Sequence, residues 1–363
     1  MNMSVKFPEN SKSKHLSAEQ IAELGQKIDA IRRDILDSVG EKDAQYIYKI
    51  RDFVRYSEIA SRGMLMFGGW IPPVWLLGTG LLGLSKIVEN MELGHNVMHG
   101  QFDWLNDPNL NGANYDWDTM ATGDDWKYTH NYIHHTYTNI VGKDHDVGYG
   151  LIRVSESQKW EPRFLFNIPL AIQLMVFFEW YVGLQNLHLE DVIAYKTKTW
   201  KEVWIESAKF RKKAVRQVAK DYVFFPLIAG PNAIPVFAGN AVANVIRSLW
   251  ASAVIFNGHF TEDAETFEPD NTETETRAEW YLRQIRGSSN FTGTEWLHIL
   301  SGNLSHQIEH HLFPDMPANR YAEAAPKIRA LCAEYGINYN EASFMKQFGS
   351  VWVRLAKCSL PNS

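Results

Sequence analysis

Histidine is the residue type whose spacing in this sequence could carry out chemistry. Eight of the thirteen histidines fall into three short motifs, and the first motif holds His95 and His99. The other two motifs place histidines at positions i, i+4 and i+5; these are His130, His134 and His135, and His306, His310 and His311. On a helix, i and i+4 share a face and i+5 lies about 100° further round. Because neutral imidazole is a common ligand of transition metals, the motifs predict a metal site.

The number of histidines indicates two metal ions rather than one. An ion that must also bind oxygen takes about four to six ligands and keeps a position open, so these histidines exceed the needs of one ion. His259 ends the last apolar stretch at the depth expected for His95 and His99, and it is predicted as a ninth ligand. Zinc suits the pattern less well, because its sites use about three or four protein ligands. We therefore predict an oxygen-activating site with two iron ions and nitrogen ligands only.

Acidic residues near the motifs are candidates to orient the ligands. A metal-bound histidine usually donates its second ring N–H to a carboxylate, a carbonyl or water. The candidates by position are Glu92, Asp118, Asp124, Asp144, Asp146 and Glu309. His145 lies between two of these acids but outside the motif pattern, so we interpret it as a structural residue or a support for the ligands. The histidines not predicted to bind metal are His15, His188 and His298.

Composition limits the classes of protein to which the chain could belong. The chain has 363 residues, a net charge of −6 and a mean hydropathy of −0.29. The mild negative charge gives no basis for binding nucleic acid, and the hydropathy argues against a transporter with many spans. The N-terminal region lacks the apolar core of a signal peptide, so we expect the N-terminus in the cytoplasm. Cys332 and Cys358 lack the spacing of a disulfide framework or a metal motif.

The predicted fold is all-α and embedded in a membrane. Apolar stretches predict four transmembrane helices in two hairpins, with a cytoplasmic helical cap that holds the histidines. The spans are predicted at residues 54–70, 72–94, 221–236 and 238–257. A further apolar segment, 164–189, is predicted as an interfacial or buried helix, because the basic helix 196–220 that follows should stay in the cytoplasm. The basic helix either lies near anionic lipid headgroups or binds the phosphates of coenzyme A.

Further helices are expected outside the membrane. An amphipathic helix follows the capping-box sequence that starts at Ser17. The third histidine motif is expected on a helix that begins near Thr294 and ends at Pro314. The remaining predicted segments are a disordered stretch over 1–15 and helices over 17–38, 42–60 and 278–286.

The order, spacing and placement of the histidine motifs resemble the three histidine boxes of the membrane fatty-acid desaturases. The third box corresponds to the sequence Gln307-Ile308-Glu309-His310-His311. Three longer stretches resemble the bacterial NADPH-dependent acyl-CoA (stearoyl-CoA) delta-9 desaturases; they are Glu89 to Gly100, Asp144 to Arg153 and Ser301 to Pro314. The resemblance implies an N-terminal cytoplasmic segment over 1–45 and a desaturase domain over 46–363.

The resemblance also implies a reaction and its participants. It implies O2-dependent removal of two hydrogens from a long saturated acyl chain, such as stearoyl-CoA or palmitoyl-CoA, to leave a cis double bond. The implied cofactors are two iron ions, with O2 as co-substrate. The haem motif His-Pro-Gly-Gly of a fused cytochrome b5 domain does not occur, so a separate NADPH-dependent ferredoxin-type oxidoreductase is expected to supply electrons. The expected location is a bacterial cytoplasmic membrane, with both termini and the active site in the cytoplasm.

Other functions stay open from the sequence alone. A hydroxylase of the same superfamily, acting on a lipid or an alkane, would use the same boxes. A membrane metal-binding or transport protein would need a path of polar residues through the spans, and Asn244 and Arg247 form no evident path. A zinc hydrolase is the third alternative. The sequence leaves open the acyl length, the carbon attacked, the oligomeric state, and whether the acyl carrier is coenzyme A, acyl carrier protein or a phospholipid.

Overall fold

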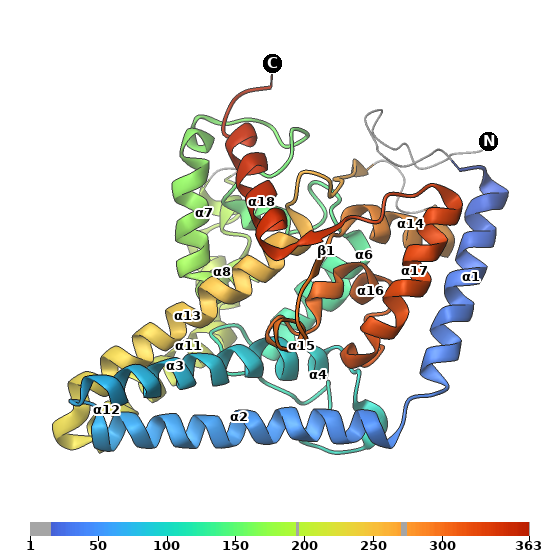
Figure 1. The fold of residues 1–363 in the computed structure, drawn as a ribbon. Helices are drawn as coiled ribbons and strands as arrows, with labels where there is room; N and C mark the ends of the chain where they lie inside the picture. Colours follow the sequence, from blue (N-terminus) through green and yellow to red (C-terminus); the bar gives the residue numbers. More distant parts are fainter. Residues whose placement is uncertain (1–15, 194–195, 270–273, 363) are drawn as a thin grey trace.

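The structure, a computed structural model, describes residues 16–193, 196–269 and 274–362. The predicted disorder of residues 1–15 therefore lies outside the described residues. Three helices, α2 (Glu41–Gly68), α3 (Pro72–Val88) and α13 (Ala233–His259), form an elongated arm, and most other helices gather at one end of it (Figure 1). The histidine motifs lie where the arm meets these helices.

Small residues let the three helices of the arm approach closely. A Cβ atom at Gly78 of α3 would lie 3.0 Å from a side-chain atom of Met64 in α2, and a Cβ at Gly83 would lie 3.2 Å from Ile246 in α13. Gly239 of α13 leaves the same narrow space to Leu65. Close backbone approach through small residues is a common way to pack helices in membrane proteins. The packing fixes α3, which continues through the turn Glu89–Gly94 to His95, and α13, which ends at His259.

Two further groups of helices complete the fold. One group shares a core made by Leu24, Ile28, Ile308 and Ile328, and it comprises α1 (Ala18–Leu36), α14 (Arg277–Gly287), α16 (Gln307–Leu312) and α17 (Tyr321–Tyr335). The other group packs against α13 and comprises α7 (Asn167–Val176), α8 (Phe178–Leu184) and α18 (Phe344–Cys358). The predicted helix 17–38 is confirmed with its capping box at Ser17, and the helix 278–286 is confirmed as α14.

One feature departs from an all-α fold. Two short parallel strands, β1 (Asn290–Thr292) and β2 (Glu341–Ser343), pair with Phe291 opposite Ala342. The shorter helices are α4 (His95–Met98), α5 (Gly123–Trp126), α6 (His135–Tyr137), α9 (Leu189–Ile193), α10 (Trp200–Glu206), α11 (Ala208–Ala219), α12 (Phe225–Ile228) and α15 (Glu295–Leu300). The fold is otherwise helical, as predicted.

The predicted membrane spans are not confirmed as four separate helices. Within the described ranges, no single helix is both long enough and apolar enough to cross a membrane. The bent pair Pro162–Val176 and Phe178–Leu187, which meet at 91°, reaches that length and composition only when taken together. The predicted span 72–94 is helical throughout, as α3 and the π-helical turn Glu89–Gly94 that follows it.

Several predicted helix boundaries were also wrong. The predicted helix 42–60 and span 54–70 are one helix, α2, and the proposed domain boundary at residue 45 falls inside it. The predicted span 221–236 is broken, because Gly230 and Pro231 interrupt the chain and α13 already begins at Ala233. The segment 164–189 is two helices rather than one, and the basic helix 196–220 is divided between α10 and α11.

Candidate metal centre

A widened helical turn precedes the first histidine box, and the second box lies largely on another. The π-helical turn Glu89–Gly94 leads into α4, and the π-helical segment Lys127–His134 leads into α6. A π-helix closes its hydrogen bonds from i to i+5 and occurs mostly as single turns at functional sites. The rings of His95 and His99 lie 4.7 Å apart between centroids. The wider turn changes the direction of the helix before His95, and in the second box it sets how His130 and His134 are oriented on the helix.

Eight of the nine predicted ligands come together in the structure. The nitrogen atoms of each group lie within 4.8 Å of one another. The first group is His95, His99, His130 and His310, and the second is His134, His259 and His311. His135 joins the two, because it groups with His310 and His311. The number of ions that these groups would hold stays a prediction, and two adjoining groups linked by His135 leave room for two.

His306 is the predicted ligand that the structure does not bring into these groups. It precedes α16, and its backbone angles of φ −103° and ψ 53° are not helical. The expected i, i+4 relation to His310 therefore fails, since both residues would have to lie on one helix. The ring of His306 stacks instead on that of His298, with 4.9 Å between centroids. The predicted helix from Thr294 ends at Leu300, ahead of the box.

Gln307 is a site residue that sequence reasoning left out of the ligand set. Its Nε2 lies 3.0 Å from Nε2 of His259, inside the second group. Gln307 is the first residue of α16, so it shares a helical face with His310 and His311 where His306 cannot. The available signal was its position three residues before His310, in the sequence Gln-x-x-His-His.

Buried ring nitrogens without partners show that the residues fit a pair of metal ions. Among the described residues these atoms include Nε2 of His134, His135 and His310. Nε2 of His95 lies 3.3 Å from Nε2 of both His99 and His130. Nε2 of His311 lies 3.1 Å from Nε2 of His259. Lone pairs this close repel each other unless a cation lies between them, and burying them without a partner is costly.

The opposite ring nitrogens of several of these histidines have hydrogen-bond acceptors that fix the rings, whereas Nδ1 of His135 and of His259 has none among the described residues. The Nδ1 pairs are His95 with Oδ1 of Asn96 at 3.2 Å, His310 with the hydroxyl of Tyr321 at 3.2 Å, and His311 with Oε1 of Gln284 at 3.0 Å. With the proton held on Nδ1, the lone pair stays on Nε2, which faces the group. This arrangement orients ligands in known metal sites.

Two of the six predicted carboxylates contact the ligands. Oδ2 of Asp144 lies 2.9 Å from Nδ1 of His134, and Oδ2 of Asp146 lies 3.5 Å from Nδ1 of both His130 and His134. Backbone N–H groups of Asn139 and Asp146 also donate to Asp144, at 2.8 and 3.0 Å. The carboxylates of Asp144 and Asp146 therefore lie against the Nδ1 side of the second-box histidines, and backbone N–H groups hold Asp144 in place.

The other four predicted carboxylates pair elsewhere. The pairs are Glu92 with Tyr46 and Asn303, Glu309 with Asn290 and Tyr339, Asp118 with Lys86 and Lys220, and Asp124 with Lys127 and Lys209. Closeness in sequence did not translate into contact, because neighbouring residues of a helix point to different faces. The prediction that these four acids orient the ligands was wrong.

Burial keeps most of the clustered imidazoles neutral. It lowers the pKa of His95 and of His259 to about 3. Burial is also the main cause that holds the pKa well below its usual range in His99, His130, His135, His310 and His311. His134 differs: burial lowers its pKa, but the carboxylates of Asp144 and Asp146 outweigh burial and raise it to about 9. Of the clustered histidines, only His134 would have to give up the proton of its charged form to bind a metal ion.

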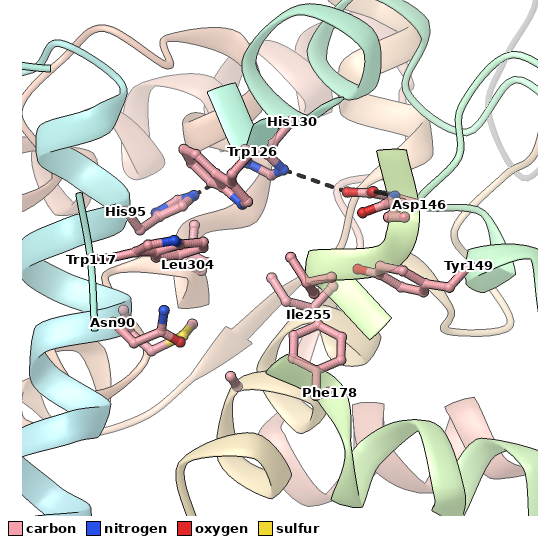
Figure 2. Close-up of a pocket in the computed structure, with 14 residues that line it drawn as sticks. Asn90, His95, Trp117, Trp126, His130, Asp146, Tyr149, Phe178, Ile255 and Leu304 are labelled. Atoms are coloured by element: carbon pink, nitrogen blue, oxygen red, sulfur yellow. Dashed lines mark hydrogen bonds and ion pairs between the residues drawn. The ribbon is translucent and has the colours of Figure 1, made fainter. Parts of the chain in front are cut away.

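A small apolar cavity lies against the first group. It has a volume of about 50 Å³, and Figure 2 shows His95 and His130 on one side of it. Its other walls include Trp117, Phe178, Ile255 and Leu304. A volume of this size holds only a few groups the size of a water molecule, so a long ligand would fill it and extend beyond it.

A larger outer cavity of about 600 Å³ adjoins the small one. Tyr149 and Gln185 line both cavities, so these side chains stand between them. The Nε2 of Gln185 donates a hydrogen bond to Asp146, which links the wall of both cavities to the ligand His130. The lining of the outer cavity is mainly apolar and includes the polar side chains of His145, Arg163 and Glu190.

Comparisons with known proteins agree with this geometry. The family model described as fatty acid desaturase matches residues 69–343. The chain is 44% identical to the NADPH-dependent stearoyl-CoA 9-desaturase of Mycobacterium tuberculosis, over 96% of this chain and 82% of that protein. It is 28% identical to the sn-1 linoleoyl-lipid 6-desaturase of Synechocystis, over 76% of this chain and 77% of that protein. It is 26% identical to fatty acid desaturase 3 of Bos taurus, over 78% of this chain and 63% of that protein.

The matched region includes all three boxes and His259, and the structure gathers eight of their histidines around one buried centre. A family model that covers most of the chain and a relative at 44% identity over 96% of it are independent of that geometry. On this evidence the chain belongs to the fatty acid desaturase family.

Proposed function

We propose that this protein is an O2-dependent acyl-CoA desaturase that introduces a cis double bond, at the delta-9 position, into a long saturated chain such as stearoyl-CoA or palmitoyl-CoA. The observation that carries the proposal is the pair of adjoining histidine groups beside an apolar cavity. The similarity to a protein named NADPH-dependent stearoyl-CoA 9-desaturase supports the choice of substrate, position and electron source.

The clustered histidines would hold two iron ions, and Gln307 would contribute its Oε1, which is buried without a hydrogen-bond partner among the described residues. The first ion would take His95, His99, His130 and His310, the second His134, His259, His311 and Gln307, and His135 lies where the two groups meet. Bound iron supplies the one-electron redox chemistry by which O2 can be used to remove hydrogens from unactivated carbon. His306 is left out of this ligand set.

The protein's own contribution is to position groups and exclude water. Trp126 stacks on His130 with 4.5 Å between ring centroids, and Trp117 packs on Trp126 at 5.0 Å, which closes the cavity on the side of the first group. Acceptors such as Asp144 and Tyr321 keep the Nδ1 protons in place, so each lone pair stays directed at the centre. Fixed geometry in a dry site is what selective removal of hydrogen requires.

In this proposal, each of the two cavities binds a different part of the substrate. The small cavity takes the methylene groups to be oxidised, beside His95 and His130. The outer cavity takes the thioester side of the molecule, and Arg163 is one of the residues that line it. Tyr149 and Gln185, which line both cavities, would contact the chain between these parts. Tyr149 is held at φ +54° between Gly148 and Gly150, which also have positive φ, so its ring direction is set by an unusual backbone.

The proposal includes a setting in the cell. Electrons would come from a separate NADPH-dependent oxidoreductase, and the protein would lie in the cytoplasmic membrane of a bacterium with both termini and the metal centre in the cytoplasm. The exposed Trp200, Trp204 and Ile205 of α10 support contact with the membrane interface, where tryptophan is enriched. The basic residues of α11 favour anionic lipid headgroups nearby.

A combined measurement tests the function. The protein is purified in detergent, its metals are counted, and it is incubated with stearoyl-CoA, NADPH, O2 and a reductase before the acyl products are analysed. Two irons per chain and a cis-delta-9 product are expected. An alcohol would favour the hydroxylase alternative, and one zinc with unchanged substrate would refute both. Replacing stearoyl-CoA by stearoyl phospholipid tests the carrier, because the 28% identical relative is named as an acyl-lipid enzyme.

A further inference from the structure

A second cluster of metal-ligating side chains lies outside the histidine boxes. The ligand atoms of His145, His188 and Glu190 all lie within 4.8 Å of one another, the same limit that gathers the histidines of the boxes. The rings of His145 and His188 are 4.3 Å apart between centroids. Nδ1 of His188 lies 3.6 Å from Oε1 of Glu190. His145 and His188 lie 43 positions apart in the sequence, so local spacing does not predict that they meet.

The backbone brings these three side chains together from two separate segments. His145 lies in the loop between Asp144 and Asp146, whose carboxylates face the metal centre. His188 has φ +48°, a conformation uncommon for histidine, and Glu190 follows in the first turn of α9. Gly150 leaves room for the carboxylate, since a Cβ atom there would lie 3.3 Å from Oε2 of Glu190. A residue other than glycine is strained in the left-handed region, so it stays there only when the surrounding structure holds it in place.

The cluster faces open space rather than the protein core. His145 and Glu190 line the outer cavity of about 600 Å³, and the side chains of His188 and Glu190 are 29% and 28% exposed. Two imidazoles and one carboxylate are the donor set of many transition-metal sites, and three protein ligands leave further positions for water or another ligand. These positions would open into the cavity.

We propose that His145, His188 and Glu190 form a third metal site, separate from the two-iron centre, which binds one divalent first-row ion such as Zn²⁺. The ion is held by two histidine nitrogens and one carboxylate oxygen. Its remaining positions face the outer cavity, where water or an anionic group of a bound molecule can occupy them. The site does not depend on the function proposed above, because its three ligands are distinct from those of the boxes.

The test is a metal titration of the full-length, iron-loaded protein in detergent. Co²⁺ is added while its visible absorption is followed, and Zn²⁺ is then used to displace it. One further equivalent per chain is expected beyond the irons. The variant His188→Asn combined with Glu190→Gln should weaken Co²⁺ binding at least about tenfold while iron content stays unchanged. Asn is chosen because it tolerates positive φ, and Gln keeps the shape of Glu.

Two control variants separate ligation from general effects. His298→Asn removes a histidine outside both metal sites, and Arg163→Gln changes the charge of the same cavity without removing a ligand. Both should retain the additional Co²⁺ equivalent. The proposal is overturned if the wild-type protein takes up no ion beyond the boxes, or if the double variant takes up the ion as tightly as the wild type. If the protein fails to load iron, that result counts against the two-iron proposal alone. The third metal site is still tested, because Co²⁺ binding can be compared between the wild type and the double variant.

Discussion

The two sides of the metal centre hold their histidines by different means. On the side of the second box, the Nδ1 atom of His134 faces the carboxylate of Asp144, with Asp146 close behind. On the side of the third box, His310 faces the hydroxyl of Tyr321 and His311 faces the amide oxygen of Gln284. One side therefore uses anions as acceptors and the other uses neutral groups.

The charge of the acceptor affects how basic the imidazoles are on each side. The carboxylates raise the pKa of His134 to about 9, whereas burial leaves His310 and His311 with pKa values well below the usual range. Anionic acceptors make the imidazole more basic and strengthen its bond to a metal ion. Neutral acceptors fix ring direction without adding charge. We infer that the second box contributes most to affinity and the third box to geometry, and the following predictions test this contrast.

The largest effect is expected from His310→Ala, because His310 belongs to the first group and to the group that joins the two sides. Iron per chain should fall from two to one or fewer, and desaturation should be lost. The matched variant is His306→Ala in the same box, which should keep both irons because His306 lies outside the groups. Metal analysis of both proteins after gel filtration decides the matter, and loss of iron in His306→Ala alone would reverse our assignment.

Asp144→Asn should have the next largest effect. Loss of a partner behind a ligand typically costs about 10- to 100-fold in metal affinity, and here the charge is lost while the shape is kept. Without this carboxylate the pKa of His134 should fall, so metal uptake should respond less to pH between about 7 and 9. Iron release to a chelator, measured over that pH range, gives both results. Asp124→Asn is the control, since Asp124 pairs with surface lysines.

Gln284→Leu should weaken metal binding by a smaller factor. It removes a neutral acceptor from His311, and a neutral hydrogen bond contributes about 1 kcal/mol, or roughly fivefold. Thr138 remains 3.3 Å from the same nitrogen and can accept in its place. Chelator competition on the purified variant measures the change. An effect as large as that of Asp144→Asn would contradict the contrast between charged and neutral acceptors.

Glu309 should influence stability and not metal content. Burial raises its pKa to about 7, although Asn290 and Tyr339 donate hydrogen bonds that favour the charged form. The folded chain thus holds a proton that the unfolded chain releases near its ordinary pKa of about 4.3. The contribution of Glu309 to the stability of the metal-free protein should therefore fall as pH rises from about 4.3 to 7, on top of the opposite dependence that the buried neutral histidines cause. Glu309→Gln should flatten this dependence in thermal unfolding, while Glu323→Gln, on the surface of α17, should not.

Much of the site followed from residue type and spacing. Eight of the nine predicted ligands meet, and the helices that begin at Ser17 and Thr276 have the capping residues that mark their starts. Other expectations failed where tertiary packing decided the outcome. A break after Leu300 moved His306 off the helix of His310 and placed Gln307 there instead. The helix boundaries in the arm shifted because α2 continues unbroken to Gly68.

The sequence by itself determined the chemistry of this protein. His95, His130 and His310 belong to short motifs, and the residue types and spacing within each motif can be read from the sequence. Those motifs predicted a histidine-rich two-metal site, and their resemblance to the histidine boxes of a known family implied a desaturase. Only the tertiary structure decided which acceptor stands behind each ring and that His145 meets His188. Such contacts join segments far apart in the chain, and their distances depend on how whole helices pack. Local periodicity carries no information about that packing.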